Sequence, residues 1–366
     1  MPTSRANENF VDCYDCHDTI NREDSVYSSG DFYCQNCYEN MENDYDSDDE
    51  SDENSDQNNH NTIDSYSYHP SPKFYDFVDN NTQMSMNSRV TRVKPFVGIE
   101  LETEDKINGG NNLHDDARYV RELTNGLIYV KDDCSLRNGF EMVSHPMSLD
   151  FIHNDTESIR NGLSHLRKKG YRAWTTSNCG QHIHISKDSF MNPAHEMKFL
   201  YFVFRNKETL INFVGRNSQF AQYDLDAFLG VADEYWNGPK PTLIEVAKGV
   251  RKDGGYVPSQ TYRNLAVNRL NEYTHELRIF RPSLRYETLL SYIEFVYCLF
   301  EYTKVVTASQ VIKENAINNF NGLANYARSF PDVYPNFIWK MHTRPNVSKA
   351  PDGWVDKPSK DKKENK

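Results

Sequence analysis

The chain has 366 residues and a net charge of −12, and apolar residues make up 37% of it, a low share for one compact globule. Nine acidic residues and no basic one lie between Glu42 and Asp56, which leaves about −3 for the rest of the chain. The acidic balance argues against a dedicated nucleic-acid binder. The longest apolar runs are far shorter than the roughly 18 residues that a membrane helix needs.

Composition divides the chain into four parts. Residues 1–41 form a cysteine-rich module, and residues 42–88 form an acidic, Asn- and Ser-rich linker that is expected to be disordered. Residues 89–345 are predicted to fold as a globular α+β domain, and residues 346–366 form a charged tail. The N-terminus lacks the apolar core of a signal peptide, which predicts a cytoplasmic protein with reduced cysteines.

The N-terminal module carries two C-x2-C hooks separated by 17 residues. This spacing is typical of a structural zinc site with four thiolate ligands, and the metal would supply the folding energy that so short a segment lacks. The turn Gly30-Asp31-Phe32-Tyr33 resembles that of a treble-clef or LIM-like finger. The predicted zinc ligands are Cys13, Cys16, Cys34 and Cys37.

Two other interpretations of these cysteines are open. Residues 13–17 also spell a c-type haem attachment pattern, but that chemistry requires export and leaves the second hook unexplained. A redox dithiol would need a thioredoxin-like strand–helix context, which the flanking sequence does not show.

Five strands and three helices are predicted in the globular part. Alternating or apolar runs predict strands at residues 92–103, 127–133, 139–146, 179–186 and 273–282. Helical periodicity is present at residues 150–169, 194–214 and 286–306, the last of them apolar enough to be buried. Since the order has no regular β-α-β rhythm, we expect an antiparallel sheet with flanking helices.

Charged side chains recur at i, i+2 spacing in these strands, which places each pair on one face. The pairs are Glu100 with Glu102, His182 with His184, and Glu276 with Arg278. Glu141 and Asp133 are two further acidic residues in or beside the predicted strands. Each pair alone is an ordinary solvated strand face. Carboxylates crowded on one sheet face, however, repel each other unless a cation neutralises them. Oxygen ligands with one or two imidazoles suit Mg²⁺ or Mn²⁺, and Arg278, Arg281 and Arg263 would bind phosphate or carboxylate.

In their order, spacing and residue types, these motifs resemble those of the amidoligase family, whose members are relatives of glutamine synthetase and glutamate–cysteine ligase. The matching segments are GIELE, then Asp133 to Ser135 followed by GFEMVSHP, then CGQHIHIS, then residues 262–282, so that the resemblance spans roughly residues 95–300. Cys134 stands where the family pattern has a small residue.

The resemblance implies a glutamine-synthetase-like sheet, ATP and two or three divalent ions. It implies catalytic or phosphate-binding roles for His184 and Arg278, with Arg263 and Arg216 as looser matches. It also implies a phage or bacterial source, and thus a host cytoplasm if the protein is phage-encoded. The implied metal ligands are Glu100, Glu102, Asp133, Glu141, His182 and Glu276.

The predicted function is therefore ATP-dependent ligation of a carboxylate to an amine through an acyl phosphate. The linker and the zinc module suggest a peptide or protein acceptor. Two alternatives stay open at this stage. One is a metallohydrolase that uses the H-x-H pair, and the other is a catalytically degenerate fold behind a zinc-finger adaptor.

Overall fold

The computed structural model of the chain describes residues 10–12, 19–28, 31–35, 62–76, 94–105, 111–174, 179–228, 264–313 and 316–343. Its centre is an antiparallel seven-stranded sheet with the order β10-β11-β9-β5-β7-β6, and β8 pairs with β5. The strands are β5 (Val97–Asp105), β6 (Ile128–Lys131), β7 (Gly139–Ser144), β8 (Tyr171–Arg172), β9 (Gln181–Ser186), β10 (Val267–Asn268) and β11 (Thr274–Phe280). All five predicted strands are present.

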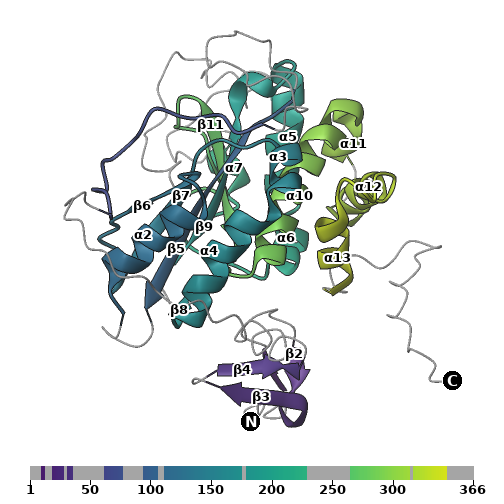
Figure 1. The fold of residues 1–366 in the computed structure, drawn as a ribbon. Helices are drawn as coiled ribbons and strands as arrows, with labels where there is room; N and C mark the ends of the chain where they lie inside the picture. Colours follow the sequence, from purple (N-terminus) through teal and green to yellow (C-terminus); the bar gives the residue numbers. More distant parts are fainter. Residues whose placement is uncertain are drawn as a thin grey trace, which may run out of the picture.

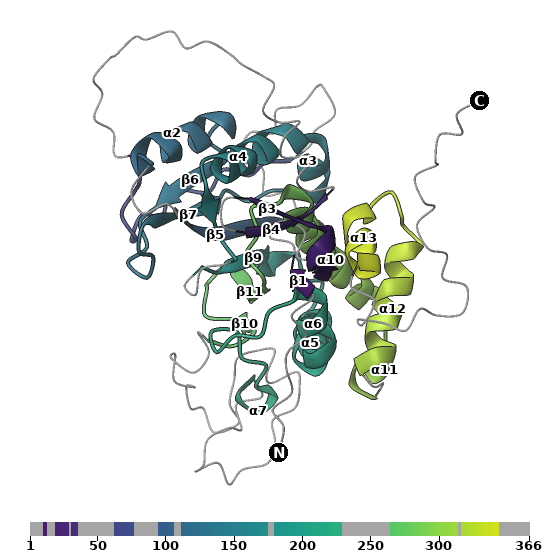
Figure 2. The same ribbon diagram turned by 90° about the horizontal axis from the view of Figure 1, so that it is seen from below.

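The helices pack on one face of this sheet or on one another. They are α2 (Leu113–Leu123), α3 (Leu149–Asn154), α4 (Thr156–Lys168), α5 (Pro193–Arg205), α6 (Lys207–Val214), α7 (Leu225–Phe228), α10 (Tyr286–Val305), α11 (Ala308–Lys313), α12 (Ala316–Arg328) and α13 (Pro335–Thr343). Figures 1 and 2 show α10, α5 and α6 on the same side of the sheet, with α12 and α13 outside α10. The α+β prediction is thus confirmed at the level of a large antiparallel sheet flanked by helices. In the described part of the chain, no helix is long and apolar enough to cross a membrane.

The alternation of the strands explains which face the helices cover. Ile99 and Leu101 on β5, and Ile183 and Ile185 on β9, are buried in the main hydrophobic cluster together with much of α10. Because side chains alternate along a strand, the residues between them point to the opposite face. That face carries the charged pairs.

Two of the predicted helices are broken in the structure. The segment 150–169 divides into α3 and α4 at Asp155, and the segment 194–214 divides into α5 and α6 at Asn206. Each junction residue hydrogen-bonds locally: Asp155 Oδ2 accepts from Ser158 Oγ at 2.6 Å, and Asn206 Nδ2 donates to the Phe202 carbonyl at 2.7 Å. Short polar residues of this kind favour helix ends over helix interiors.

Within the predicted linker, 42–88, the structure describes residues 62–76, here called the arm, and this segment lies against the domain. Asp64 forms a parallel bridge with Lys131 on the edge strand β6, and Tyr75 forms one with Met147. The average composition of the linker is polar, but four aromatic residues lie within the arm. They pack on the domain, for example Tyr68 edge-on against Tyr129 and Phe74 edge-on against Phe96.

The N-terminal module contributes two small hairpins to the described residues, β1 (Phe10–Asp12) with β2 (Thr19–Asn21) and β3 (Ser25–Ser28) with β4 (Asp31–Cys34). Tyr33 is buried, and its hydroxyl lies 3.4 Å from Arg172 Nη2 beside the central sheet. Cys34 is the last residue of β4. The other predicted zinc ligands, Cys13, Cys16 and Cys37, lie outside the described residues, so the zinc site stays a prediction.

Gly139 begins β7 where no side chain fits. A Cβ atom there would lie 1.9 Å from the Thr103 carbonyl oxygen, whereas one at Gly98 would meet nothing closer than 3.7 Å. We expect Gly139→Ala to lower the free energy of unfolding by about 1–3 kcal/mol, because the backbone must shift. Gly98→Ala is the control and should change it by less than about 0.5 kcal/mol. Urea unfolding of both variants checks this, and equal stability would contradict the close packing of β5 on β7.

Candidate metal and phosphate site

The strand register gathers the predicted ligands on the open face of the sheet. Glu100 on β5 lies opposite His182 on β9, and Glu102 lies opposite Glu141 on β7. On the other side of β9, His184 lies opposite Glu276 of β11. Four neighbouring strands therefore bring these side chains together, although they come from segments up to 176 residues apart.

The first group consists of Glu100, His184 and Glu276. One potential ligand atom from each residue lies within 4.8 Å of the others. His184 Nε2 is 3.1 Å from Glu100 Oε1, and His182 Nδ1 is 3.0 Å from Glu100 Oε2 and 3.2 Å from Glu276 Oε1. Two carboxylates and an imidazole at this spacing form a ligand set that suits a divalent cation.

The second group consists of Glu102, Asp133 and Glu141, which likewise offer ligand atoms within 4.8 Å of one another. The backbone N–H of Gly180 donates to Glu102 Oε2 at 2.6 Å. A Cβ at Gly180 would lie 3.4 Å from Glu102 Oε1 and 3.0 Å from His182 Nε2, so the glycine in CGQHIHIS leaves room for the carboxylate. Three carboxylates without an imidazole favour a hard cation such as Mg²⁺.

The charges in the two groups are balanced differently. Burial opposes ionisation of Glu100, but the His184 and His182 imidazoles hold the pKa of Glu100 well below its usual value. Burial also opposes the charge of His184, yet Glu100 and Glu276 raise the pKa of His184 to about 9. In the first group, imidazolium charge therefore compensates the carboxylates.

In the second group, nearby positive charge does not offset burial and the crowding of carboxylates. Burial and the negative charge of Glu100 raise the pKa of Glu141 to about 8, although Lys131 Nζ lies 3.8 Å from its Oε2. Burial also raises the pKa of Glu102, and the charge of Asp133 adds to this. Crowded carboxyl groups that resist ionisation are those that a bound cation would stabilise most.

Arginines border both groups. Arg278 Nη1 pairs with Glu276, and Arg278 Nε donates to the Phe220 carbonyl at 3.2 Å. Arg216 donates to the Phe280 carbonyl at 2.8 Å, and burial lowers the pKa of Arg216, although Glu102 opposes this. Arg281 is buried, with its guanidinium 3.3 Å from the centroid of the Trp174 ring. Arg263 lies outside the described residues.

Sequence reasoning missed three residues that hold the ligands. Lys131 lies opposite Glu141 in the β6–β7 pairing. Asn268 Nδ2 and Asn271 Nδ2 donate to Glu276 Oε2 at 2.7 and 3.3 Å. Asn268 and Asn271 shortly precede the E-x-R strand, whereas Lys131 ends β6. An isolated Asn or Lys has no diagnostic spacing, so no sequence pattern indicated them.

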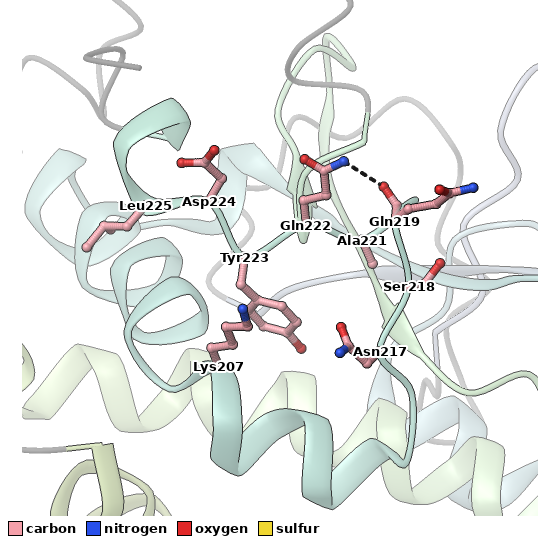
Figure 3. A pocket seen from close by; sticks show the side chains of 9 residues that line it. All are labelled: Lys207, Asn217, Ser218, Gln219, Ala221, Gln222, Tyr223, Asp224 and Leu225. Atoms are coloured by element: carbon pink, nitrogen blue, oxygen red, sulfur yellow. Dashed lines mark hydrogen bonds between the residues drawn. The ribbon is translucent and has the colours of Figure 1, made fainter.

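Two pockets lie near this face. One of about 800 Å³ adjoins Glu100 and His184. The other, of about 640 Å³, lies between α6 and residues 217–225 and holds none of the predicted site residues. Figure 3 shows the Tyr223 ring directed between Lys207 and Asn217, and Gln222 donating to the Gln219 carbonyl at 3.0 Å.

Comparisons with known proteins leave the family undecided. No family model and no curated protein matches the chain. Among solved structures, the crystal structure of the complex between prokaryotic ubiquitin-like protein Pup and its ligase PafA is similar, with a TM-score of 0.35 and 8% sequence identity. The match covers 70% of this chain and 64% of the matched chain. A similarity at this level decides neither the family nor the reaction.

Proposed function

We propose that the chain is an ATP-dependent carboxylate–amine ligase that forms an amide or isopeptide bond through an acyl phosphate. The observation that carries the proposal is the pair of adjacent ligand groups on one sheet face, with Arg278 paired to Glu276. A hydrolytic zinc centre would favour nitrogen or sulfur ligands with an open position. Here the second group offers carboxylates alone, which favours Mg²⁺ and phosphate chemistry.

The side chains fit divalent ions in two places. Glu100, Glu276 and His184 or His182 would hold one ion, and Glu102, Asp133 and Glu141 would hold the other. When bound, such ions neutralise phosphate charge and make the phosphorus a better electrophile. The two imidazoles keep the carboxylates of the first group ionised and therefore ready for a metal.

The chain's own residues orient the reacting groups. In the first step a carboxylate oxygen attacks the γ-phosphorus, the bond to the β-phosphate oxygen breaks, and ADP leaves. An amine then attacks the acyl carbon and gives an amide, inorganic phosphate and a proton. Arg278, a hydrogen-bond donor at the edge of the first group, would bind the transferred phosphoryl oxygens.

Trapping the acyl phosphate tests the reaction. The intact chain is incubated with ATP, Mg²⁺, hydroxylamine and a panel of carboxylic acids that includes peptides with acidic side chains. We expect one acid to yield its hydroxamate in a one-to-one ratio with ADP, because hydroxylamine captures an acyl phosphate. Hydroxamate without ADP, or ester or peptide hydrolysis that needs Zn²⁺ and no ATP, would favour the metallohydrolase instead.

The acceptor is proposed to be a peptide or protein. The N-terminal module, with its predicted zinc site, lies against the domain through Tyr33 and Arg172. A module in this position would raise the local concentration of a bound protein substrate. Removing residues 1–41 should then raise KM for the protein acceptor and leave kcat with a small amine unchanged; equal losses for both would contradict this role.

A further inference from the structure

The pocket of about 800 Å³ lies at the Val97 end of β5 and is walled by the arm. Pro70, Pro72 and Phe74 form one side, and Tyr273 and Thr274 at the start of β11 form another. Glu100 and His184 line the same space. Its volume falls within the range of about 300–1,000 Å³ that is usual for small-molecule sites.

The two ends of this pocket differ in chemistry. Away from Glu100 and His184 the lining is largely aromatic and apolar, with Phe74 and Phe96 packed edge-on at 5.2 Å and an exposed Tyr273, although Asn271 and Glu272 also line it. The inner end is polar and opens on the first ligand group through Glu100 and His184. A ligand that fills both ends needs a flat apolar part joined to an anionic, metal-binding part.

We propose that this pocket binds the base of the nucleoside triphosphate and that the arm is an essential wall of it. The inference rests on the proposed function, which places the triphosphate on the first ligand group. From there the base reaches the apolar end, between Phe74 and Tyr273. Aromatic and proline side chains around a planar base bind it by stacking and by burial of apolar surface.

The arm is fixed at both ends, as a binding wall requires. The Asp64 N–H donates to the Val130 carbonyl and the Tyr75 N–H to the Pro146 carbonyl, both at 2.8 Å. Asp76 accepts from Ser148 Oγ at 2.6 Å and pairs with Lys94 at 2.7 Å. The pocket-lining residues 70–74 therefore lie between two hydrogen-bonded anchors on the sheet.

A practical consequence concerns the functional boundary of the domain. Composition places that boundary near residue 89, whereas the pocket requires residues from about 62 onward. Truncation at residue 89 would remove Pro70, Pro72 and Phe74 together with both anchors.

The experiment compares two ligands on the full-length chain by calorimetry, both with Mg²⁺: ATP, and tripolyphosphate, which has the triphosphate but no base. We expect the wild type to bind ATP at least about tenfold more tightly than tripolyphosphate. Phe74→Ala should weaken ATP binding about tenfold and leave tripolyphosphate binding unchanged. Tyr273→Ala, at an exposed position on the opposite wall, should act in the same way.

The matched control is Phe330→Ala, which removes an exposed aromatic side chain after α12, outside the pocket, and should change neither affinity. Equal affinities of the wild type for the two ligands, with no effect of either pocket variant, would overturn the base pocket while leaving the ligase proposal intact. Equal loss of both ligands in Phe74→Ala would also overturn it, because the arm would then shape the phosphate site. Binding of neither ligand by the wild type would refute the ligase proposal itself.

Discussion

Glu276→Gln is expected to remove one of two Mn²⁺-binding sites, with an affinity loss of about a hundredfold or more at that site. Glu276 is buried, contacts His182 at 3.2 Å and accepts from Asn268 at 2.7 Å, so its position is fixed before a cation arrives. An amide keeps the shape but loses the charge that a hard divalent cation requires. Mutation of a residue that only hydrogen-bonds to a metal ligand commonly lowers metal affinity roughly 10- to 100-fold.

Electron paramagnetic resonance of free Mn²⁺ measures the number of sites and their affinities. Glu208→Gln on the exposed surface of α6 makes the same chemical change away from the site and should keep both sites. The second site, built on Glu102, Asp133 and Glu141, should persist in Glu276→Gln. Two undiminished sites in that variant would show that Glu276 is not a ligand.

Glu141→Gln is expected to stabilise the metal-free protein at pH 8 by about 4 kcal/mol. The pKa of Glu141 is about 8 in the fold, against 4.5 for an ordinary glutamate. The folded state therefore keeps a proton that the unfolded chain has released, and this favours unfolding as the pH rises. The wild type in EDTA should thus lose stability between pH 4.5 and about 8, and Glu141→Gln should lose less.

Mg²⁺ should reverse this order. A cation on the second group stabilises the ionised wild type, and it should give Glu141→Gln a much smaller increase in melting temperature. Glu157→Gln, at an exposed position on α4, is the control. Parallel stability–pH curves for the wild type and Glu141→Gln in EDTA would contradict the crowding of carboxylates around Glu141.

Much of the site could be predicted because strands have a period of two. Glu100 and Glu102 were assigned to one face from their spacing alone, and the structure places them there, opposite His182 and Glu141. The order of the strands was beyond the sequence, since register depends on contacts between distant segments. It is the register that divides the ligands into two groups.

The errors have local physical causes. The helices break at Asp155 (φ −99°, ψ 61°) and Asn206 (φ −99°, ψ 27°), where the backbone leaves the helical region although the apolar periodicity continues through both residues. Short polar residues such as Asp and Asn favour helix ends over helix interiors. Composition does not single out the arm, because a window average treats Tyr66, Tyr68, Phe74 and Tyr75 as exceptions in a polar stretch. In the structure they are the residues that attach this segment to the sheet.

The most direct test of a metal-dependent nucleotide site on the open sheet face is calorimetric titration of ATP into the intact chain, with Mg²⁺ and then with EDTA. It needs no knowledge of the carboxylate or the amine. We predict saturable binding at one ATP per chain with Mg²⁺, and none with EDTA. Equal ATP binding with Mg²⁺ and with EDTA, or no binding under either condition, would contradict the assignment of these carboxylates and histidines to a ligase site.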